Sequence, residues 1–227
     1  MTDKTIPQTQ MVPGYQIRAR ILDVYPIIWR RFLLRADNTF ADLHYALQIA
    51  LDWSDDFLHH FKLRGKTISV PRMFNEYTHS ATKLTLADFN FKEGQRFLYE
   101  YNFYVFWQIE IRIEKLCSVP VNSFYPKCID GKRAGPIEDC GGPSGFMQLR
   151  DHHLVYANQW MLDLCHLLLE ADEMTEELRE EIDAKRNEYH QLKYWINIER
   201  FKRRPINQRL KLYADGNDEW HHTVEVG

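Results

Sequence analysis

Apolar and polar residues alternate along two early stretches of the chain and predict paired strands. From Tyr15 to Asp23 the alternation leaves one side apolar and the other rich in Gln and Arg, which is typical of a half-buried strand. Residues 27–35 predict a second strand, and the two can form a hairpin around residues 24–26. A third strand is predicted over residues 57–63.

A helix is predicted between the second and third strands. Thr39 is a good N-cap, and Asp42 three residues later makes a shortened capping box. Four apolar residues recur at spacings of three and four, which places them on one helical stripe: Phe40, Leu43, Leu47 and Leu51. The helix therefore has one apolar side to bury.

The strongest β pattern lies over residues 97–116. Aromatic residues alternate with polar ones in its first half, and isoleucines alternate with charged residues in its second half. A turn near residues 104–106 would fold this stretch into a hairpin. Before it, residues 65–95 carry turn signals and predict a long insertion with little regular structure.

The C-terminal part of the chain changes from loop to helix. Prolines and glycines make residues 118–146 loop-like, and the pattern turns helical from about His152. A near-heptad stripe then runs through seven residues: Met174, Leu178, Ile182, Lys185, Tyr189, Leu192 and Ile196. Its acidic start and basic end suit the helix dipole, and Pro205 is expected to end the helix. Residues 210–213 and 223–226 could form a small hairpin at the tail, or the tail could fray.

These elements follow the order β-β-α-β-insertion-β-β, and helices come last. The prediction is an α+β fold: a mixed β-sheet with one helix packed across it, β-grasp-like, plus a C-terminal helical segment. The expected divisions are a flexible arm (1–13), an α+β core (14–150), C-terminal helices packed on that core (151–212) and a tail (213–227).

Composition places the chain among folded proteins and limits its partners. With 44% hydrophobic and 27% charged residues, wholesale disorder is not expected. The net charge of −3 offers nucleic acid no overall attraction, so a basic patch would have to be local. No stretch approaches about 18 apolar residues, and the N-terminus lacks the apolar core of a signal peptide. We therefore expect a cytoplasmic protein without membrane contact.

One set of residues has the chemistry of a zinc site. Cys128 and Cys140 lie in the loop rich in Gly and Pro, and His152 and His153 follow it. Thiolates and imidazoles that converge tetrahedrally bind zinc, and such a loop can wrap an ion. The alternative is two loop thiols without a metal, because the chain has no C-x-x-C pair. Zinc is the one cofactor that the sequence indicates.

Two basic stretches are candidates for contact with nucleic acid. The denser one lies near the C-terminus: Arg200, Lys202, Arg203, Arg204 and Arg209. The alternative, which we favour, is a solvated helix end that balances the acidic start. Trp29-Arg30-Arg31 combines an aromatic ring with cations, but neighbouring strand residues point to opposite faces, which halves that patch. The same alternation separates His59 from His60, so these two cannot chelate one ion.

The stripe over residues 174–196 is a candidate surface for a protein partner or a homodimer. The alternatives are packing on its own domain or pairing with a helix around residues 155–169. No Walker loop, G-x-G-x-x-G, G-x-S-x-G or H-E-x-x-H motif occurs. Their absence weakens an enzymatic interpretation without excluding it.

Three stretches together resemble the plasmid pRiA4b ORF-3-like family. They are PIIWRRFLLRADNTFADLHYALQIALDWSDDFLHHF (26–61), TLADFNFKEGQRFLYEYNFYVFWQIEI (85–111) and YPKCIDGKRAGPIEDCGGPSGF (125–146), with a weaker echo in NIERFKRRPINQRL (197–210). Some members of that family are labelled insertion-sequence passenger proteins of the TnpR type. A serine recombinase needs an activated serine, and this chain has no serine in such a context.

The chain also departs from the family pattern. Acidic residues and histidines of the pattern are replaced here by Phe57, Asn102, Val105 and Ile109, and the middle loop cysteine by Gly135. If those groups form one metal or acid–base site, this chain is a divergent member that lacks it. The prediction is a non-enzymatic binding or interaction protein associated with plasmids or mobile elements. The alternatives are a zinc-binding protein or metal-dependent enzyme that uses the cysteine loop, and a DNA-binding accessory protein.

Overall fold

Eight strands and five α-helices make up the part of the chain that the computed structural model describes, residues 10–70, 79–169, 175–184 and 186–221. The strands are β1 (Met11–Ile21), β2 (Trp29–Arg35), β3 (His59–Leu63), β4 (Lys66–Ser69), β5 (His79–Ser80), β6 (Arg96–Tyr101), β7 (Trp107–Pro120) and β8 (Lys127–Lys132). The helices are α1 (Phe40–Leu51), α2 (Gly142–Leu169), α3 (Glu176–Ala184), α4 (Arg186–Ile196) and α5 (Arg203–Ala214), with 3₁₀ turns η1 (Ala87–Phe89) and η2 (Asp218–His221).

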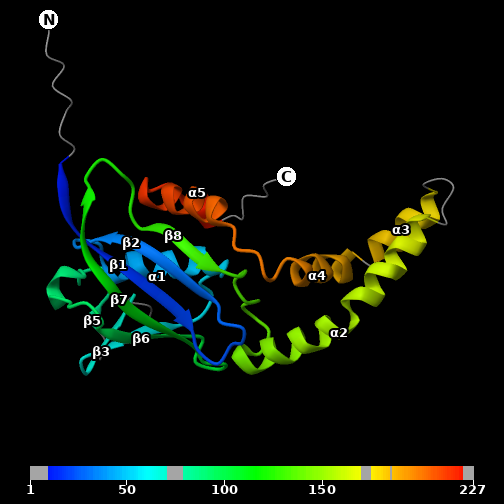
Figure 1. The fold of residues 1–227 in the computed structure, drawn as a ribbon, viewed down its shortest axis with the longest axis horizontal. Helices are drawn as coiled ribbons and strands as arrows, with labels where there is room; N and C mark the ends of the chain where they lie inside the picture. Colours follow the sequence, from blue (N-terminus) through cyan, green and yellow to red (C-terminus); the bar gives the residue numbers. More distant parts are fainter. Residues whose placement is uncertain (1–9, 71–78, 170–174, 185, 222–227) are drawn as a thin grey trace, which may run out of the picture.

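All eight strands belong to one sheet, in the order β5-β4-β3-β6-β7-β1-β2-β8. Neighbouring strands are antiparallel except β4 and β5, which are parallel, so the sheet is mixed. Strands β1 and β7 pair along the whole of β1, from Met11 opposite Pro120 to Ile21 opposite Ile109. Figure 1 shows these long strands at the centre of the sheet, with α1 behind them.

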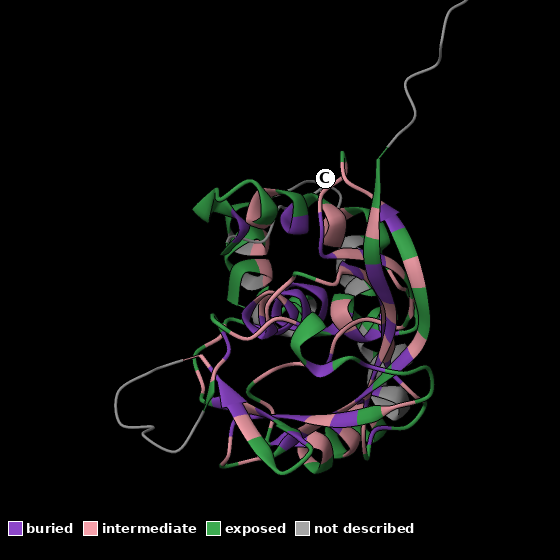
Figure 2. Ribbon diagram, turned by 90° about the vertical axis from the view of Figure 1, so that its left-hand side faces the viewer, coloured by how far each residue is buried: buried purple, intermediate pink, exposed green. Residues whose placement is uncertain are grey.

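Helix α1 covers one face of the sheet, the inner face, and forms the core with it. Thr39 caps the helix: its hydroxyl accepts from the Asp42 N–H, and the Asp42 carboxylate accepts in return from the Thr39 N–H at 2.7 Å. Phe40 packs edge-on against Phe61 with ring centroids 5.2 Å apart. Figure 2 shows the sheet curving round the buried helix. The predicted stripe is confirmed, since all four of its residues are buried.

Helix α5 closes the core beside β8. Leu210 is completely buried. The side-chain amide of Asn207 accepts from the Cys128 N–H at 2.9 Å and donates to the Cys128 carbonyl at 2.7 Å, which satisfies a free edge of β8. The buried Arg209 donates to the Asp52 carboxylate at 2.6 Å and so ties α5 to the end of α1.

Helices α2, α3 and α4 form an arm. In Figure 1 α2 runs away from the sheet, and α3 and α4 return beside it. At the base of the arm Trp195 of α4 packs on Phe146 and His153 of α2, with ring centroids 5.5 and 5.0 Å apart. Leu192, a member of the predicted stripe, is buried, which supports pairing within the chain at this end. No helix of the described ranges is long and apolar enough to cross a membrane.

The structure confirms the α+β class, the mixed sheet with a helix across it, and a C-terminal helix; the β-grasp likeness stays a prediction. Strand β1 begins at Met11, so the end of the predicted arm (1–13) pairs with β7 instead. Residues 118–146 are not all loop, because they contain β8 and the start of α2. Strand β8 shows no clear alternation in sequence. Its Gly131 is needed for close packing, because a Cβ there would lie 2.7 Å from the Phe201 ring.

The C-terminal boundaries also differ from the prediction. Pro205 does not end a helix but lies in the first turn of α5, where its missing N–H is not needed. Residues 210–213, a predicted half of a tail hairpin, belong to α5, and the other half lies outside the described residues, as do Met174 and Lys185 of the stripe. Helix α5 and the base of the arm, through Phe146 and Trp195, share the hydrophobic core, while the outer part of the arm projects in Figure 1; the predicted domain division stays a prediction.

Candidate functional site: a buried histidine cluster

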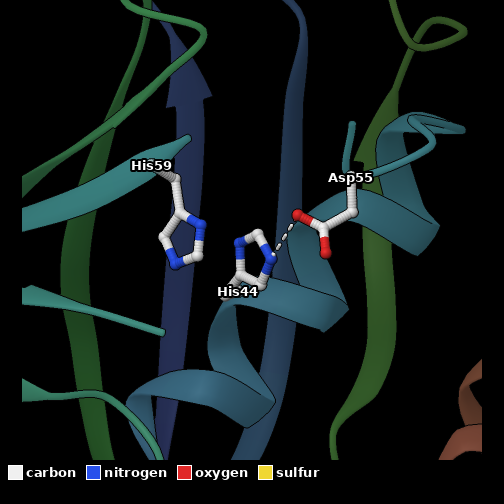
Figure 3. Close-up of side chains that lie close together, drawn as sticks. All are labelled: His44, Asp55 and His59. Carbon is white, nitrogen blue, oxygen red and sulfur yellow. Dashed lines mark hydrogen bonds and ion pairs between the residues drawn. The ribbon is translucent and has the colours of Figure 1, made fainter. Parts of the chain in front are cut away.

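Polar side chains gather on the inner face where α1 crosses β3 and β6. His44 and Gln48 lie one turn apart on α1, and both are completely buried. His59 begins β3, and Tyr99 lies on the neighbouring β6. Asp55 follows α1 in the left-handed conformation, with φ of 63°, which aspartate tolerates. Figure 3 shows His44 between His59 and Asp55. We call these five residues the histidine cluster.

A directional chain of hydrogen bonds joins four of the five. Gln48 Nε2 donates to the Tyr99 hydroxyl at 2.9 Å, so that hydroxyl directs its proton to His44 Nδ1, also 2.9 Å away. With Nδ1 as an acceptor, His44 carries its proton on Nε2 and donates to Asp55 Oδ1 at 2.9 Å. Burial raises the pKa of Tyr99 well above its usual value, so the hydroxyl keeps its proton. Gln48 Oε1 is buried and accepts no hydrogen bond from the described residues.

His59 completes a set of potential metal ligands. Its ring stacks on that of His44, with 3.6 Å between centroids and 11° between planes. One ligand atom each from His44, Asp55 and His59 lies within 4.8 Å of the others, the one such set of three in the described part of the chain. Two imidazoles and a carboxylate are a donor set for zinc and for iron. Stacked rings do not aim their lone pairs at one point, so an ion requires the His59 ring to tilt.

A second polar group fixes the loop beside the cluster. The Glu138 carboxylate accepts from the Tyr101 hydroxyl, from the Ser54 hydroxyl at 2.6 Å and from the Ser54 N–H at 2.8 Å. Trp53 stacks on Tyr101 at 5.1 Å and donates its indole N–H to the Pro136 carbonyl at 2.9 Å. Burial, with the nearby carboxylate, raises the pKa of Tyr101. These contacts hold the loop after α1, which carries Asp55 of the histidine cluster.

The predicted zinc ligands have separate surroundings. Cys128 is completely buried in β8, and Cys140 is half-buried in the turn before α2. Burial raises the pKa of both thiols to about 11, so both are protonated at neutral pH. His152 is exposed on α2, while His153 is buried against α4. Among the residues described, no set of three or more potential ligands includes any of these four.

The predicted nucleic-acid contacts lie at the start of α5 rather than at the end of a long helix. Arg200, Lys202 and Arg204 are exposed, and Arg203 donates to a β8 carbonyl at 3.0 Å. Arg209 is buried and bonded to the end of α1, so it is unavailable to a ligand. Cations at a helix N-terminus oppose the dipole, so the dipole argument for this cluster is wrong.

Two departures from the family pattern border these polar groups. Ile109 pairs with Tyr99 across β6 and β7, and Phe57 packs edge-on against Tyr101 at 5.9 Å. A Cβ at Gly135 would lie 2.0 Å from the carbonyl oxygen at the end of α1, so the cysteine of the family pattern does not fit this backbone. The hypothesis that one family site has been lost here stays a prediction.

His44 and Gln48 were not predicted from the sequence as site residues, and His59 was predicted without a partner. A signal was available, because both helix residues lie on the buried side of α1 beside the leucine stripe, where polar groups need partners. The separation of His59 from His60 is confirmed. His60 faces the opposite side of the sheet, where its Nε2 lies 2.6 Å from a glutamate of β6.

Comparisons with known proteins define the family. The family model described as plasmid pRiA4b ORF-3-like protein matches residues 13–204, and the chain belongs to this family. It is 26% identical over 135 residues to uncharacterized protein y4hQ of Sinorhizobium fredii (strain NBRC 101917 / NGR234), a match that covers 59% of this chain and 69% of y4hQ. The crystal structure of MM3350, a protein of unknown function from Methanosarcina mazei Go1, is similar with a TM-score of 0.59 and 30% identity, over 74% of this chain and 94% of that one.

Proposed function

We propose that this protein is a non-enzymatic binding module in which His44, Asp55 and His59 hold a zinc ion. The proposal rests on one observation: two imidazoles and a carboxylate lie close together in the core, with ligand atoms within 4.8 Å of one another. Zinc lies about 2.0–2.2 Å from nitrogen and oxygen ligands, so ligand atoms around one ion are roughly 3–3.5 Å apart. His44 Nε2 and Asp55 Oδ1, 2.9 Å apart, are slightly closer than this spacing and need to separate only a little, and His59 is the ligand that moves.

The proton on His44 changes place when the ion binds. Nε2 becomes a ligand, so Nδ1 carries the proton and donates it to the Tyr99 hydroxyl oxygen. Histidine ligands of metals usually donate their other N–H to a fixed oxygen, and Tyr99 supplies it here. The Tyr99 hydroxyl then donates its hydrogen bond to Gln48 Oε1, once the Gln48 amide has rotated. Without the ion, this oxygen accepts no hydrogen bond from the described residues.

Burial favours a structural ion over a catalytic one. His44 is fully buried and His59 is 3% exposed, so a substrate has no path to an ion between them. Three protein ligands leave the fourth position of a tetrahedral zinc to a water molecule. The burial of His44 and His59 shields that position, and an ion bound there adds its binding free energy to folding. The family name refers to a plasmid, and the proposal includes an association with plasmids or mobile elements on that name alone.

Calorimetric titration of the folded protein with zinc chloride tests the proposal. The wild type should bind about one ion per chain. His59→Gln should abolish binding, whereas His60→Gln, the matched change on the other face of the same strand, should retain it. Cys128→Ser/Cys140→Ser should also retain it. Loss in the cysteine variant alone would move the site to the loop, and folded wild type that binds no zinc would contradict the proposal.

A second candidate function, contact with a further copy of this chain, is favoured by the arm. Three apolar side chains on the outer half of α2 are exposed: Met161 by 44%, Leu162 by 54% and Leu169 by 84%. Pairing of two arms would bury them. Light scattering should then give a dimer mass for the wild type and a monomer mass for Leu162→Glu/Leu169→Glu. A monomeric wild type at high concentration would exclude this function.

A further inference from the structure

A row of arginines crosses the outer face of the sheet, the face opposite α1. Arg96 of β6 lies opposite Arg112 of β7, and Arg112 lies opposite Arg18 of β1. Arg18 in turn lies opposite Arg31 of β2. Strands are about 4.8 Å apart, so this arginine row spans roughly 14 Å. Like charges directly opposite one another on antiparallel strands are destabilising, so the row costs the fold stability at each pair.

Acidic side chains neutralise the two ends of the row. Arg31 donates to both carboxylate oxygens of Glu114, at 2.6 and 3.1 Å. Arg96 donates to Glu110 at 3.1 Å. Glu110 is shared, because it also lies 3.4 Å from Arg20. Both ends are therefore paired: the bidentate Arg31–Glu114 pair is partly buried, with side chains 26% and 18% exposed, whereas Arg96 is 54% exposed in its pair with Glu110.

The middle of the row has no such partners. Within the described part of the chain, neither Arg18 nor Arg112 forms an ion pair. Arg112 is exposed, with an arginine opposite it on each side. The Arg18 guanidinium lies over the Trp29 ring at 4.7 Å from its centroid, and that of Arg31 lies 5.0 Å from the same centroid. Stacking on one aromatic ring restrains both groups on the sheet surface.

We infer that the arginine row binds the phosphodiester backbone of single-stranded nucleic acid. Guanidinium groups bind phosphate oxygens in a bidentate manner, and two of the four, Arg18 and Arg112, form no ion pair within the described residues. A line of cations suits a polyanion better than a single phosphate ion. A flexible single strand can follow a twisted sheet surface, which is the mode of several sheet-based RNA-binding domains, whereas a rigid duplex touches such a surface at few points.

The arginine row includes part of the basic patch predicted from the sequence at Trp29-Arg30-Arg31. Of Trp29-Arg30-Arg31, the middle residue faces inward and is 2% exposed, and the other two face outward. The arginines that replace Arg30 on the outer face come from β1, β6 and β7, far away in the sequence. This surface is also separate from the basic start of α5. It is independent of the histidine cluster, which lies on the inner face.

Fluorescence anisotropy with a labelled oligothymidylate of about 20 nucleotides tests the inference. If the row contacts three or four phosphates, affinity should fall about 20- to 50-fold between about 50 and about 200 mM salt. Arg18→Gln/Arg112→Gln should weaken binding about tenfold or more at the lower salt concentration. The matched variant Arg200→Gln/Arg204→Gln removes the same charge at the start of α5 and should bind as the wild type does.

A melting curve separates lost binding from lost folding. Because Arg18→Gln/Arg112→Gln removes like-charge pairs as well as the stacking of Arg18 on Trp29, its melting temperature should stay close to that of the wild type. Wild type without salt-dependent binding would overturn the inference, and so would equal weakening in the α5 variant. A duplex of the same length that binds as tightly as the single strand would overturn the assignment to single strands.

Discussion

The two faces of the sheet use polar residues in opposite ways. On the inner face the polar groups are buried and joined by hydrogen bonds, as in the chain from Gln48 through Tyr99 and His44 to Asp55. On the outer face the arginine row sets like charges side by side, and its middle members, Arg18 and Arg112, form no ion pair within the described residues. The first arrangement is explained by the fold itself, whereas the second is the observation from which we infer binding to nucleic acid.

Two neighbouring residues show the difference at its clearest. Arg30 points inward, is 2% exposed and donates to the carbonyls of Ala50, Trp29 and Lys132 at 2.9, 2.9 and 3.1 Å. Burial lowers its pKa to about 10, because no carboxylate offsets the loss of water. Arg31 points outward and donates hydrogen bonds to the carboxylates of Glu114 and Asp130. The role of these two arginines therefore depends on the face of the sheet to which each side chain points, although the residue type is the same.

Truncating the inner face should have the largest effect. Phe40 is completely buried against three other phenylalanine rings. Phe40→Ala should lower the free energy of unfolding by about 3–5 kcal/mol in urea titrations, because it leaves a cavity. Leu33→Ala on the outer face should cost less than about 1 kcal/mol. Similar losses in the two variants would show that the faces do not differ in packing as described.

The Arg30 and Arg31 pair gives the next largest contrast. Arg30→Ala leaves three carbonyls without their donor and should cost about 2–4 kcal/mol in the same titration. Arg31→Ala breaks partly exposed ion pairs and should cost at most about 1 kcal/mol. The reverse order would contradict the assignment of Arg30 to the inner face.

Alkaline pH should act through the inner face. The folded pKa of Tyr99 is raised, so its contribution to stability is fully present below about pH 10, its unfolded value, and is lost as the pH rises through the folded value. Tyr99→Phe should cost about 1 kcal/mol at pH 7 through the lost hydrogen bond to His44. Its unfolding free energy should then fall less steeply than that of the wild type above about pH 10. Parallel curves would mean that the Tyr99 hydroxyl is not buried.

The smallest effect is expected in the middle of the arginine row. Arg112→Gln should leave the free energy of unfolding unchanged or raise it by up to about 0.5 kcal/mol, because the variant relieves two like-charge pairs. The melting temperature should change in the same direction. Arg20→Gln, which breaks an ion pair on the same face, should lower it slightly. If Arg112→Gln destabilises the protein by more than 1 kcal/mol or so, the residue has a structural partner and the contrast between the faces fails.

The sequence predicted the regular parts of the fold because their periodicity is complete. The paired first strands, the Thr39 cap, the apolar stripe of α1 and the hairpin of β6 and β7 all appear as expected. β8 was missed because contacts with α5 and with the segment just before it replace alternation there: Gly131 lies against Phe201, before α5, and Asn207 of α5 binds Cys128. Such contacts between distant segments leave no local pattern.

The candidate site was harder to predict for the same reason. His44, Asp55 and His59 come from a helix, a loop and a strand, and their spacing matches no metal motif. The two cysteines were predicted as zinc ligands because thiols in a glycine-rich loop are a familiar zinc pattern. Burial raises the pKa of both, so both are protonated at neutral pH. The arginine row is visible only in the strand register, which the sequence alone does not supply.

The most direct test of the proposed metal site is a crystal structure grown with zinc, with an anomalous difference map at the zinc absorption edge. The account predicts one strong peak bonded to His44 Nε2 and Asp55 Oδ1, with the His59 ring tilted out of its stack to supply the third ligand. A map with no peak in the histidine cluster, or with its peak beside Cys128 or Cys140 instead, would contradict it.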